Sequence, residues 1–553
     1  SRAAPRRSGS RRHGKSMSTL NELEHLHNQT DAALGALAEA IDTFWTLSMA
    51  IVILLMQAGF AMLEAGAVRE RSVRDILLKN TMDVCVCAFI WAAFGSMLAS
   101  DTHGPFLGWR VLPNDTATPF EAIDVAQGDD MSIYFLGYLY AATSSTIVSG
   151  AIAERTQQRA YIILSCAMAG LIYPAVVHWL WTDRGWLSWT NEDAVLGGAY
   201  DFAGASVVHL TGGVVALLGA KIVGPRAGRF NARDQPPNEL RGHSSALSAV
   251  GTFLLAVGWL GFNLGSIRHI TLPGAPRVAA HTAVCTSLSG SAGSLAALGV
   301  MRCRRGAVWS LEHACNGWLA GLVSITACAS AVDTLMSIVI GALGGLLYVA
   351  ASHVVAHVLR VDDVLDAFAV HGACGCWSML AAGFLCNGAA IDGPGPLGTF
   401  YGGDGQLIAA NLLAVVAISA WALLLGSVAM VPLHRAGLMR ISAEFETTGI
   451  DVSEMGRAAY SSGVEADGQP VLAASREVSA DSDVESMAPG AAPVVAVRVP
   501  GATGAGLELV GSRERSMSPA GVAEGSPVDV DVHNGAPQES GRPAGRSLRP
   551  ISV

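Results

Sequence analysis

Asp201-Phe-Ala-Gly-Ala-Ser-Val-Val-His209 opens a long apolar run and places a histidine inside it. A looser copy, Asp366-Ala-Phe-Ala-Val-His371, opens a second such run. An ionisable side chain within a membrane span is costly, so it indicates a site or a pathway and calls for a partner. We therefore expect the fold to bring His209 and His371 together inside a membrane.

The composition of the whole chain supports a membrane location. Of 553 residues, 51% are hydrophobic and 14% are charged, and the mean hydropathy is +0.41, which excludes a soluble protein of several domains. The 62 glycines fit a polytopic membrane protein, because small residues let membrane helices approach closely. The net charge of -10 argues against a nucleic-acid partner.

Eleven apolar runs of about 20 residues are each long enough to cross the hydrocarbon core. We predict an all-α polytopic membrane protein with eleven transmembrane helices, in a domain of residues 43–431. The runs lie near residues 43–66, 79–100, 131–152, 160–181, 201–222, 246–266, 279–301, 307–329, 333–354, 366–388 and 407–431.

The distribution of cations predicts the orientation. Alternate loops are rich in arginine, for example 67–78 and 223–245, whereas loop 101–130 is acidic and loop 388–406 has no cation. Because cytoplasmic loops carry the excess of lysine and arginine, we expect the N-terminus outside and the C-terminus in the cytoplasm. The plasma membrane is the expected location, with an internal organelle as the alternative.

The two ends of the chain differ from the apolar domain. We assign residues 1–42 to an extracellular N-terminal segment, in which the basic stretch 1–16 has no apolar core and is no secretory signal. Met17 is the expected natural start, so 1–16 are not expected to be native. Residues 432–460 form a predicted cytoplasmic regulatory segment. Residues 461–553 lack periodicity and are rich in Gly, Ala, Ser and Pro, which predicts a disordered cytoplasmic tail.

The two histidine-bearing stretches predict an internal repeat. Spans five and ten each begin with aspartate, continue with Phe-Ala and reach Val-His. Five spans per unit require the second copy to be inverted, which places a substrate site at the interface of the two copies. We expect Asp201 and Asp366 to cap helix starts by accepting bonds from backbone N–H groups, with direct contact to a cation as the alternative.

The histidines indicate a pore rather than a metal site. His209 lies eight residues past Asp201, roughly 12 Å along a helix. Paired imidazoles share a proton and present an uncharged, hydrogen-bonding wall to a small polar solute. Two histidines without a carboxylate or thiolate set bind metal weakly, so we expect no metal and no cofactor. A single histidine bonded to a neighbouring carbonyl is the structural alternative.

An aromatic and hydroxyl pattern marks the outer ends of two spans. Phe262 and Ser266 are four residues apart on one helix face, and span four ends at Trp181. An aromatic face with a hydroxyl acceptor offsets part of the hydration that a monovalent cation loses. Aromatic belts at the membrane interface are the alternative explanation for the tryptophans.

Several ordered motifs resemble those of the Amt/Mep/Rh ammonium transporter family, and of its Amt branch in particular. The resemblance spans roughly residues 40–460. It rests on Asp201–His209, on Ala153-Glu154-Arg155 after 147–152, on Gly261-Phe-Asn-Leu-Gly-Ser266, on Asp363-Val-Leu-Asp-Ala-Phe-Ala-Val-His-Gly372 and on residues 440–453, which are similar to the family's regulatory segment.

The resemblance implies a homotrimer with one pore per subunit and a five-plus-five inverted repeat. It assigns Trp181 and Ser266 to an outer ammonium recruitment site, which Tyr140 and Asp201 adjoin. It assigns Tyr140 and Phe262 to a gate of two stacked aromatic rings, and His209 and His371 to the pore. Tyr140 stands where the family usually has phenylalanine. Gly449 and Ser453 match regulatory positions, Ser453 where plant relatives carry a phosphorylated threonine.

The expected function is ammonium transport through a hydrophobic pore with two histidines, in a protein that is not an enzyme. One alternative is an ammonium sensor on the same scaffold, and another is a neutral gas channel of the Rh kind. An intramembrane hydrolase would need a nucleophile or paired aspartates within the bilayer, whereas the aspartates lie at helix ends.

Overall fold

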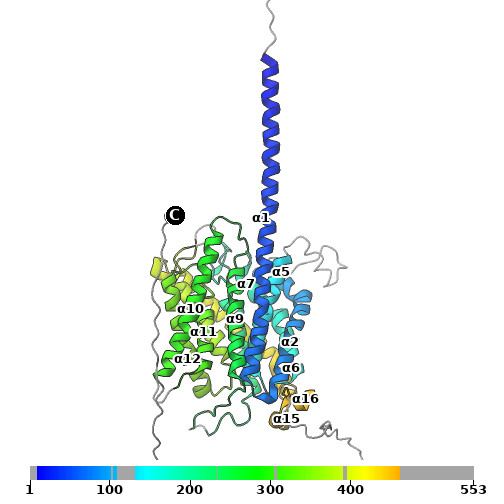
Figure 1. Cartoon of the computed structure of the whole chain (residues 1–553), viewed down its shortest axis with the longest axis vertical. Helices are drawn as coiled ribbons and strands as arrows, with labels where there is room; N and C mark the ends of the chain where they lie inside the picture. Colours follow the sequence, from blue (N-terminus) through cyan, green and yellow to red (C-terminus); the bar gives the residue numbers. More distant parts are fainter. Residues whose placement is uncertain are drawn as a thin grey trace, which may run out of the picture. The chain divides into compact units, whose positions relative to one another are not determined.

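A computed structural model describes residues 9–100, 104–108, 131–232, 235–303, 308–389 and 395–460, and the side chains from Leu20 onward. The predicted tail, residues 1–8 and most of the acidic loop 101–130 lie outside these residues. The described part is a bundle of helices with no strand (Figure 1). The predicted all-helical class is therefore confirmed.

Several membrane-length segments are built from more than one helix, often with a π-turn between or before the α-helical parts. The helices of the bundle are α1 (Gly9–Ala67), α2 (Val73–Ile90), η2 (Trp91–Gly95), α3 (Ser96–Ala99), α5 (Met131–Ile152), α6 (Gln158–Ala167), η4 (Met168–Ile172), α7 (Tyr173–Trp181), η6 (Ala205–Leu210), α8 (Thr211–Val223), α9 (Ser245–Gly265), α10 (Ala275–Arg302), α11 (Leu311–Ile325), α12 (Thr334–His353), η7 (Val354–Val358), η8 (Phe368–Ala373), α13 (Cys374–Leu385) and α14 (Gln406–Arg435). Short helices in the connections are η1 (Glu70–Ser72), η5 (Val195–Gly197), η9 (Thr399–Tyr401), α15 (Ala443–Thr448) and α16 (Ile450–Met455).

Ten helical segments of the described chain are long and apolar enough to cross a membrane. They coincide with ten of the eleven predicted spans. The remaining prediction, near 307–329, corresponds to α11, which has only 15 residues but packs against α10 and α12 within the bundle. Ser310 begins α11 by accepting a bond from the backbone N–H of His313 at 3.3 Å.

The first helix is longer than the predicted span 43–66. It begins at Gly9, and Figure 1 shows it projecting past the other helices before it enters the bundle beside α9. The two helices approach closely because α9 carries Gly251 at their contact. A Cβ atom there would lie 2.2 Å from the backbone nitrogen of Leu63, so no larger residue fits.

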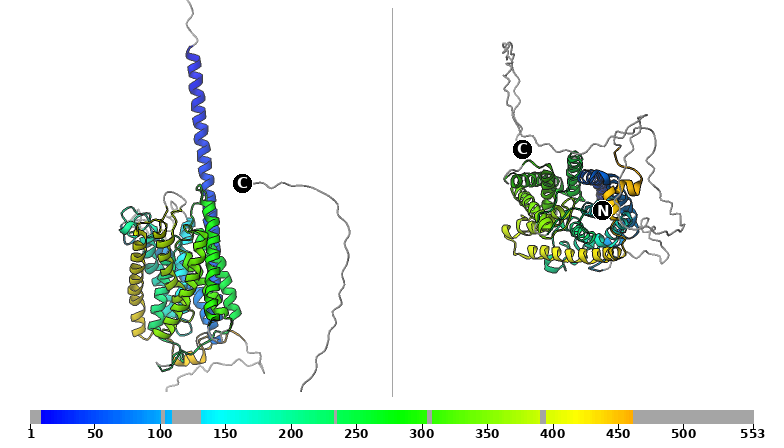
Figure 2. Two further views of the ribbon diagram at one scale, coloured as in Figure 1. Left: turned by 90° about the vertical axis from the view of Figure 1, so that its left-hand side faces the viewer. Right: turned by 90° about the horizontal axis from the view of Figure 1, so that it is seen from below.

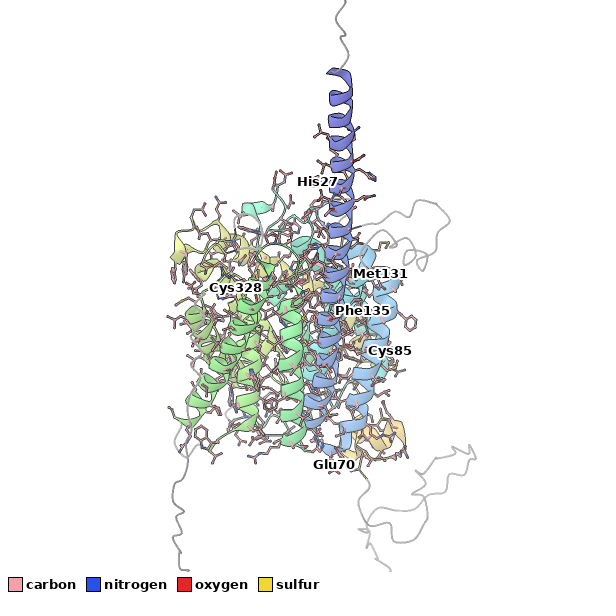
Figure 3. All side chains as sticks on the ribbon, turned by 45° about the horizontal axis from the view of Figure 1, so that its top comes forward. His27, Glu70, Cys85, Met131, Phe135 and Cys328 are labelled. Carbon is pink, nitrogen blue, oxygen red and sulfur yellow. The ribbon has the colours of Figure 1, made fainter. Side chains whose placement is uncertain are left out.

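The two ends of the bundle carry different features. α15 and α16 lie at the end where α2 begins, which we call the tail face (Figure 2). Figure 3 labels Glu70 at this face and Met131, the first residue of α5, toward the other end. That other end, where α5 begins and α7 ends, is called the vestibule face.

The histidine-bearing helices run in opposite directions. α8 ends at the tail face, where the carbonyl of Val223 accepts a bond from Arg440 at 2.8 Å. α13 ends at the vestibule face, and Asn411 on the neighbouring α14 bonds both Met379 of α13 and Tyr200, which precedes η6. This antiparallel pair is the centre of the five-plus-five inverted repeat.

Candidate functional site

Asp201 organises the start of the first histidine helix. Its carboxylate Oδ1 accepts the backbone N–H groups of Gly204 and Ala205 at 2.9 and 2.8 Å. Its Oδ2 accepts the N–H groups of Ser206 and Val207 at 2.7 and 3.1 Å, and the Ser206 hydroxyl at 2.7 Å. The carboxylate thus satisfies donors that the first turn of a helix leaves free.

Asp363 has the equivalent place before the second histidine helix. Its two oxygens accept the N–H groups of Ala367 and Phe368 at 3.0 and 2.8 Å. Burial, and then the negative charge of Asp366, raise the pKa of Asp363 to about 7. Our expectation that Asp366 is the cap was wrong, because its carboxylate instead accepts the hydroxyls of Tyr348 and Ser352.

A column of rings leads from the vestibule face into the bundle. Neighbouring ring centroids are 5.7, 4.5, 5.3 and 5.2 Å apart, in the order Trp181, Tyr140, Phe262, His209 and His371. Phe262 and His209 are fully buried, so this ring column closes the bundle between its two ends. These five residues come from α5, α7, α9 and the two histidine helices, which the sequence separates widely.

The two imidazoles are in direct contact. Their Nδ1 atoms are 3.2 Å apart, and the rings are stacked with an interplanar angle of 23°. The Trp259 ring stacks with His209 at a centroid distance of 4.8 Å and also with His371 at 6.4 Å, which fixes the plane of both imidazoles. The Nε2 atom of His209 is buried and has no hydrogen-bond partner among the described residues. This nitrogen is available to a solute in the bundle interior.

Both histidines lie in π-turns, η6 and η8. A π-turn frees one backbone hydrogen bond and is frequent at functional sites. Gly204, just before η6, has φ +96° and brings the chain close to Trp181, where a Cβ would lie 3.0 Å from the indole ring. The local backbone of η6 therefore serves to place His209.

A cavity of about 220 Å³ opens at the vestibule end of the ring column. The Trp181 Nε1–H group donates to the carbonyl oxygen of Asp201 at 2.7 Å, which holds the indole at the cavity wall. The Tyr140 hydroxyl donates to the carbonyl oxygen of Phe262 at 2.9 Å and lies 3.2 Å from the Ser266 hydroxyl. All four residues assigned to ammonium recruitment, Trp181, Ser266, Tyr140 and Asp201, line this cavity.

Arg268 also lines the cavity, which the sequence analysis missed. It is exposed and follows Ser266 by two residues. Its position in the sequence, next to the predicted hydroxyl acceptor Ser266, is the signal from which Arg268 could have been predicted. A permanent positive charge at this place lowers the local concentration of cations.

The tail face holds the predicted regulatory residues against the loops of the bundle. Gly449 has φ +112°, and a Cβ there would lie 2.7 Å from the Cβ of Arg71. Two residues later, the Asp451 carboxylate accepts the N–H groups of Arg74 and Asp75 at the start of α2, both at 2.9 Å. The Ser453 hydroxyl donates to the carbonyl oxygen of Gly449 at 2.9 Å. The segment is thus docked on the first turn of α2.

Buried ion pairs join the tail-face loops. Arg226 contacts Glu154 at 2.7 Å and Asp362 at 2.9 Å, and Glu154 also pairs with Arg69. Burial alone would raise the pKa of Asp362, but hydrogen bonds from Arg226 and its charge hold it well below the usual range. The Glu154-Arg155 motif therefore joins the tail-face loops and takes no part in the ring column.

The chain is similar to several known proteins. Residues 43–460 match the model of the Ammonium Transporter Family. Ammonium transporter 3 of Dictyostelium discoideum is 34% identical over 76% of this chain and 94% of its own length. Ammonium transporter Amt2 of Archaeoglobus fulgidus is 36% identical over 76% of this chain and 88% of its own.

Solved structures are also similar. One described as a sensor Amt protein has a TM-score of 0.66 at 26% identity, covering 75% of this chain and 98% of its own. Candida albicans Mep2 has a TM-score of 0.63 at 26% identity, covering 73% of this chain and 86% of its own.

Proposed function

The chain belongs to the ammonium transporter family, and we propose that it recruits ammonium at the vestibule cavity and conducts it past the ring column and the two histidines. The observation that carries this proposal is the contact between His209 and His371 directly below the rings of Tyr140 and Phe262, which meet edge to face at 63° rather than stacked as expected. Transport of ammonium across a membrane, without catalysis, is the activity of the family.

Recruitment is explained by the walls of the vestibule cavity. The indole face of Trp181 and the ring of Tyr140 attract a cation through their π-electrons. The hydroxyl oxygens of Ser266 and Tyr140 replace part of the water that ammonium loses. The Asp201 carboxylate is occupied by five donors, so we assign it to positioning Trp181 and η6 rather than to binding ammonium directly.

Conduction is explained by the change from a polar to an apolar environment. The buried ring column strongly disfavours a bare cation, because the cation loses its hydrating water there and gains too few polar contacts in exchange. We propose that ammonium gives up a proton on entry, and that ammonia and the proton then cross separately. The free Nε2 of His209 offers ammonia a hydrogen-bonding partner at mid-column.

The proposed assembly is a homotrimer in the plasma membrane, with the vestibule face outside and the tail face in the cytoplasm. The bias of arginine toward the loops of the tail face supports this orientation. Each subunit would then carry its own pore.

Parallel measurements of current and uptake test the function. Oocytes expressing the chain from Met17 should take up labelled ammonium in a saturable manner, with an evoked current if the proton crosses as well. Uptake without current would favour the neutral channel. Absence of both, with the protein at the surface, would contradict transport.

A sensor is the second candidate, because one similar solved structure is described as a sensor Amt protein. A sensor would bind ammonium at the vestibule cavity with negligible flux. Binding measured by calorimetry on the purified chain, together with uptake at background level, would identify it.

Arg268→Gln should lower the KM for ammonium by about two- to fivefold at low ionic strength, because a like charge is removed from the vestibule cavity. The effect should shrink as salt screens the charge. Arg277→Gln is the matched control, since this arginine is exposed on α10 and does not line the cavity. A KM that is equal in Arg268→Gln and the wild type would contradict this electrostatic role.

Ser453→Asp should lower maximal uptake and leave KM unchanged. The new carboxylate cannot donate to the carbonyl of Gly449 and lies two residues from Asp451, whose oxygens hold the first turn of α2. Repulsion should therefore loosen the tail-face contact. Ser453→Ala, which removes the hydrogen bond without adding charge, is the control. Uptake that is the same for Asp and wild type would exclude phosphate control at this position.

A further inference from the structure

A second cavity, of about 20 Å³, lies below the histidines toward the tail face. Its lining includes Phe60, Glu64, Asn316, Leu365 and His371. The volume is enough for about one water-sized molecule. Phe60 continues the ring column, with its centroid 6.1 Å from that of His371. A solute that passes His371 therefore enters this tail-side cavity, in which Glu64 is the only acidic side chain of the lining.

The Glu64 carboxyl is held by neutral groups. Asn80 Nδ2 donates to its Oε2 at 2.7 Å, and the Ser149 hydroxyl donates to its Oε1 at 2.5 Å. The side chain is 1% exposed, and no arginine or lysine forms an ion pair with it among the described residues. A buried carboxyl without a cationic partner is most stable in its protonated form.

The neighbouring amide of Asn80 is held in one orientation. Asn80 Nδ2 donates both to Glu64 and to the carbonyl of Ile76, at 2.7 and 2.9 Å, which fixes the orientation of the amide. Asn80 Oδ1 is then a buried acceptor with no donor among the described residues.

Few other titratable groups surround Glu64. Lys79 and Asp83 on α2, Tyr161 on α6 and His371 on η8 are the nearest. Lys79 Nζ is engaged by Asp75 at 2.6 Å and by the carbonyl of Thr156 at 2.8 Å. Asp83 accepts three hydroxyl groups, and α9, which packs along α1, contains no titratable residue.

We propose that Glu64 is the proton-exchanging group at the tail-side end of the pore, where it returns a proton to ammonia. In this step the O–H bond of the Glu64 carboxylic acid breaks, an N–H bond forms on ammonia, and ammonium leaves behind a carboxylate. The carboxylate then takes a proton from a water molecule of the tail face, whose O–H bond breaks and which leaves as hydroxide. The inference rests on the proposed function, since it requires that ammonia passes His371.

Glu64→Gln tests the proposal, because it keeps the size of the side chain and one of its two acceptor oxygens but removes the exchangeable proton. In oocytes whose internal pH is set with butyrate, labelled-ammonium uptake should fall about tenfold or more and lose its dependence on internal pH. Glu64→Asp should keep that dependence at an intermediate rate, with a midpoint that differs from that of the wild type. Asp83→Asn is the control, since this buried carboxyl belongs to the same polar cluster but does not line the cavity.

Two results would overturn the proposal. One is wild-type uptake and pH dependence in Glu64→Gln. The other is a parallel fall in Glu64→Gln and Asp83→Asn with the pH dependence retained, which indicates a structural role only. If Glu64→Gln does not reach the membrane, Glu64→Asp replaces it in the test. A midpoint of the dependence of uptake on internal pH that is identical in Glu64→Asp and the wild type would then overturn the proposal. Failure of the function itself would differ, because the wild type would then show no uptake.

Discussion

His209→Ala is expected to abolish both saturable ammonium uptake and any evoked current. The imidazole contacts the rings of Trp259 and His371, at centroid distances of 4.8 and 5.2 Å. Its loss leaves the Nδ1 of His371 without its partner, which costs about 1–3 kcal/mol at a buried site. It also removes the free Nε2 that ammonia would meet at mid-column. Uptake and current should be measured together in oocytes with equal surface protein.

His281→Ala is the matched control for this variant. Its ring is part-buried, bonds the carbonyl of Val332 at 2.8 Å and lies outside the ring column, so uptake should stay close to that of the wild type. Saturable uptake that persists in His209→Ala would show that the substrate bypasses the histidines. A large unsaturable current would show that the column excludes cations by means of this ring alone.

Sequence patterns were sufficient for the membrane architecture, because lipid imposes a length and a composition on every span. Ten of eleven predicted spans meet those limits, and the histidine spacing revealed the inverted pair. The extent of α1 was not predicted. Its segment 20–42 is rich in alanine, leucine and glutamate, which favour helix. Helix propensity could therefore have predicted that α1 begins well before the apolar span.

The candidate site was predictable where spacing is strict and unpredictable where it depends on three-dimensional contact. Asp363 precedes His371 by eight residues, as Asp201 precedes His209, yet the looser Phe-Ala match led to Asp366. Only the backbone geometry, with φ +59° at Asp366, separates the two carboxyls. Glu64 lies on the first span, far in sequence from His371, and only packing brings it to the same cavity.

Asp201→Asn is expected to destabilise the protein more than Asp363→Asn and to eliminate uptake. An asparagine keeps one acceptor oxygen, so at Asp201 at least two of five donors lose their partner. At about 1–3 kcal/mol for each buried donor, the loss is about 2–6 kcal/mol. At Asp363 only one of two N–H donors is lost, for about 1–3 kcal/mol.

Thermal unfolding of the purified variants in detergent measures this order. The difference should appear as a lower midpoint for Asp201→Asn than for Asp363→Asn, because the two carboxylates have equivalent places in the inverted pair and differ in the number of donors they accept. Uptake should fail in Asp201→Asn even in molecules that reach the surface, since the lost bonds hold η6, which places His209, and fix the backbone of residue 201, whose carbonyl oxygen accepts the Trp181 N–H at 2.7 Å. Equal midpoints would mean that the donors at η6 find water or other acceptors, and that the aspartate acts on ammonium by its charge instead.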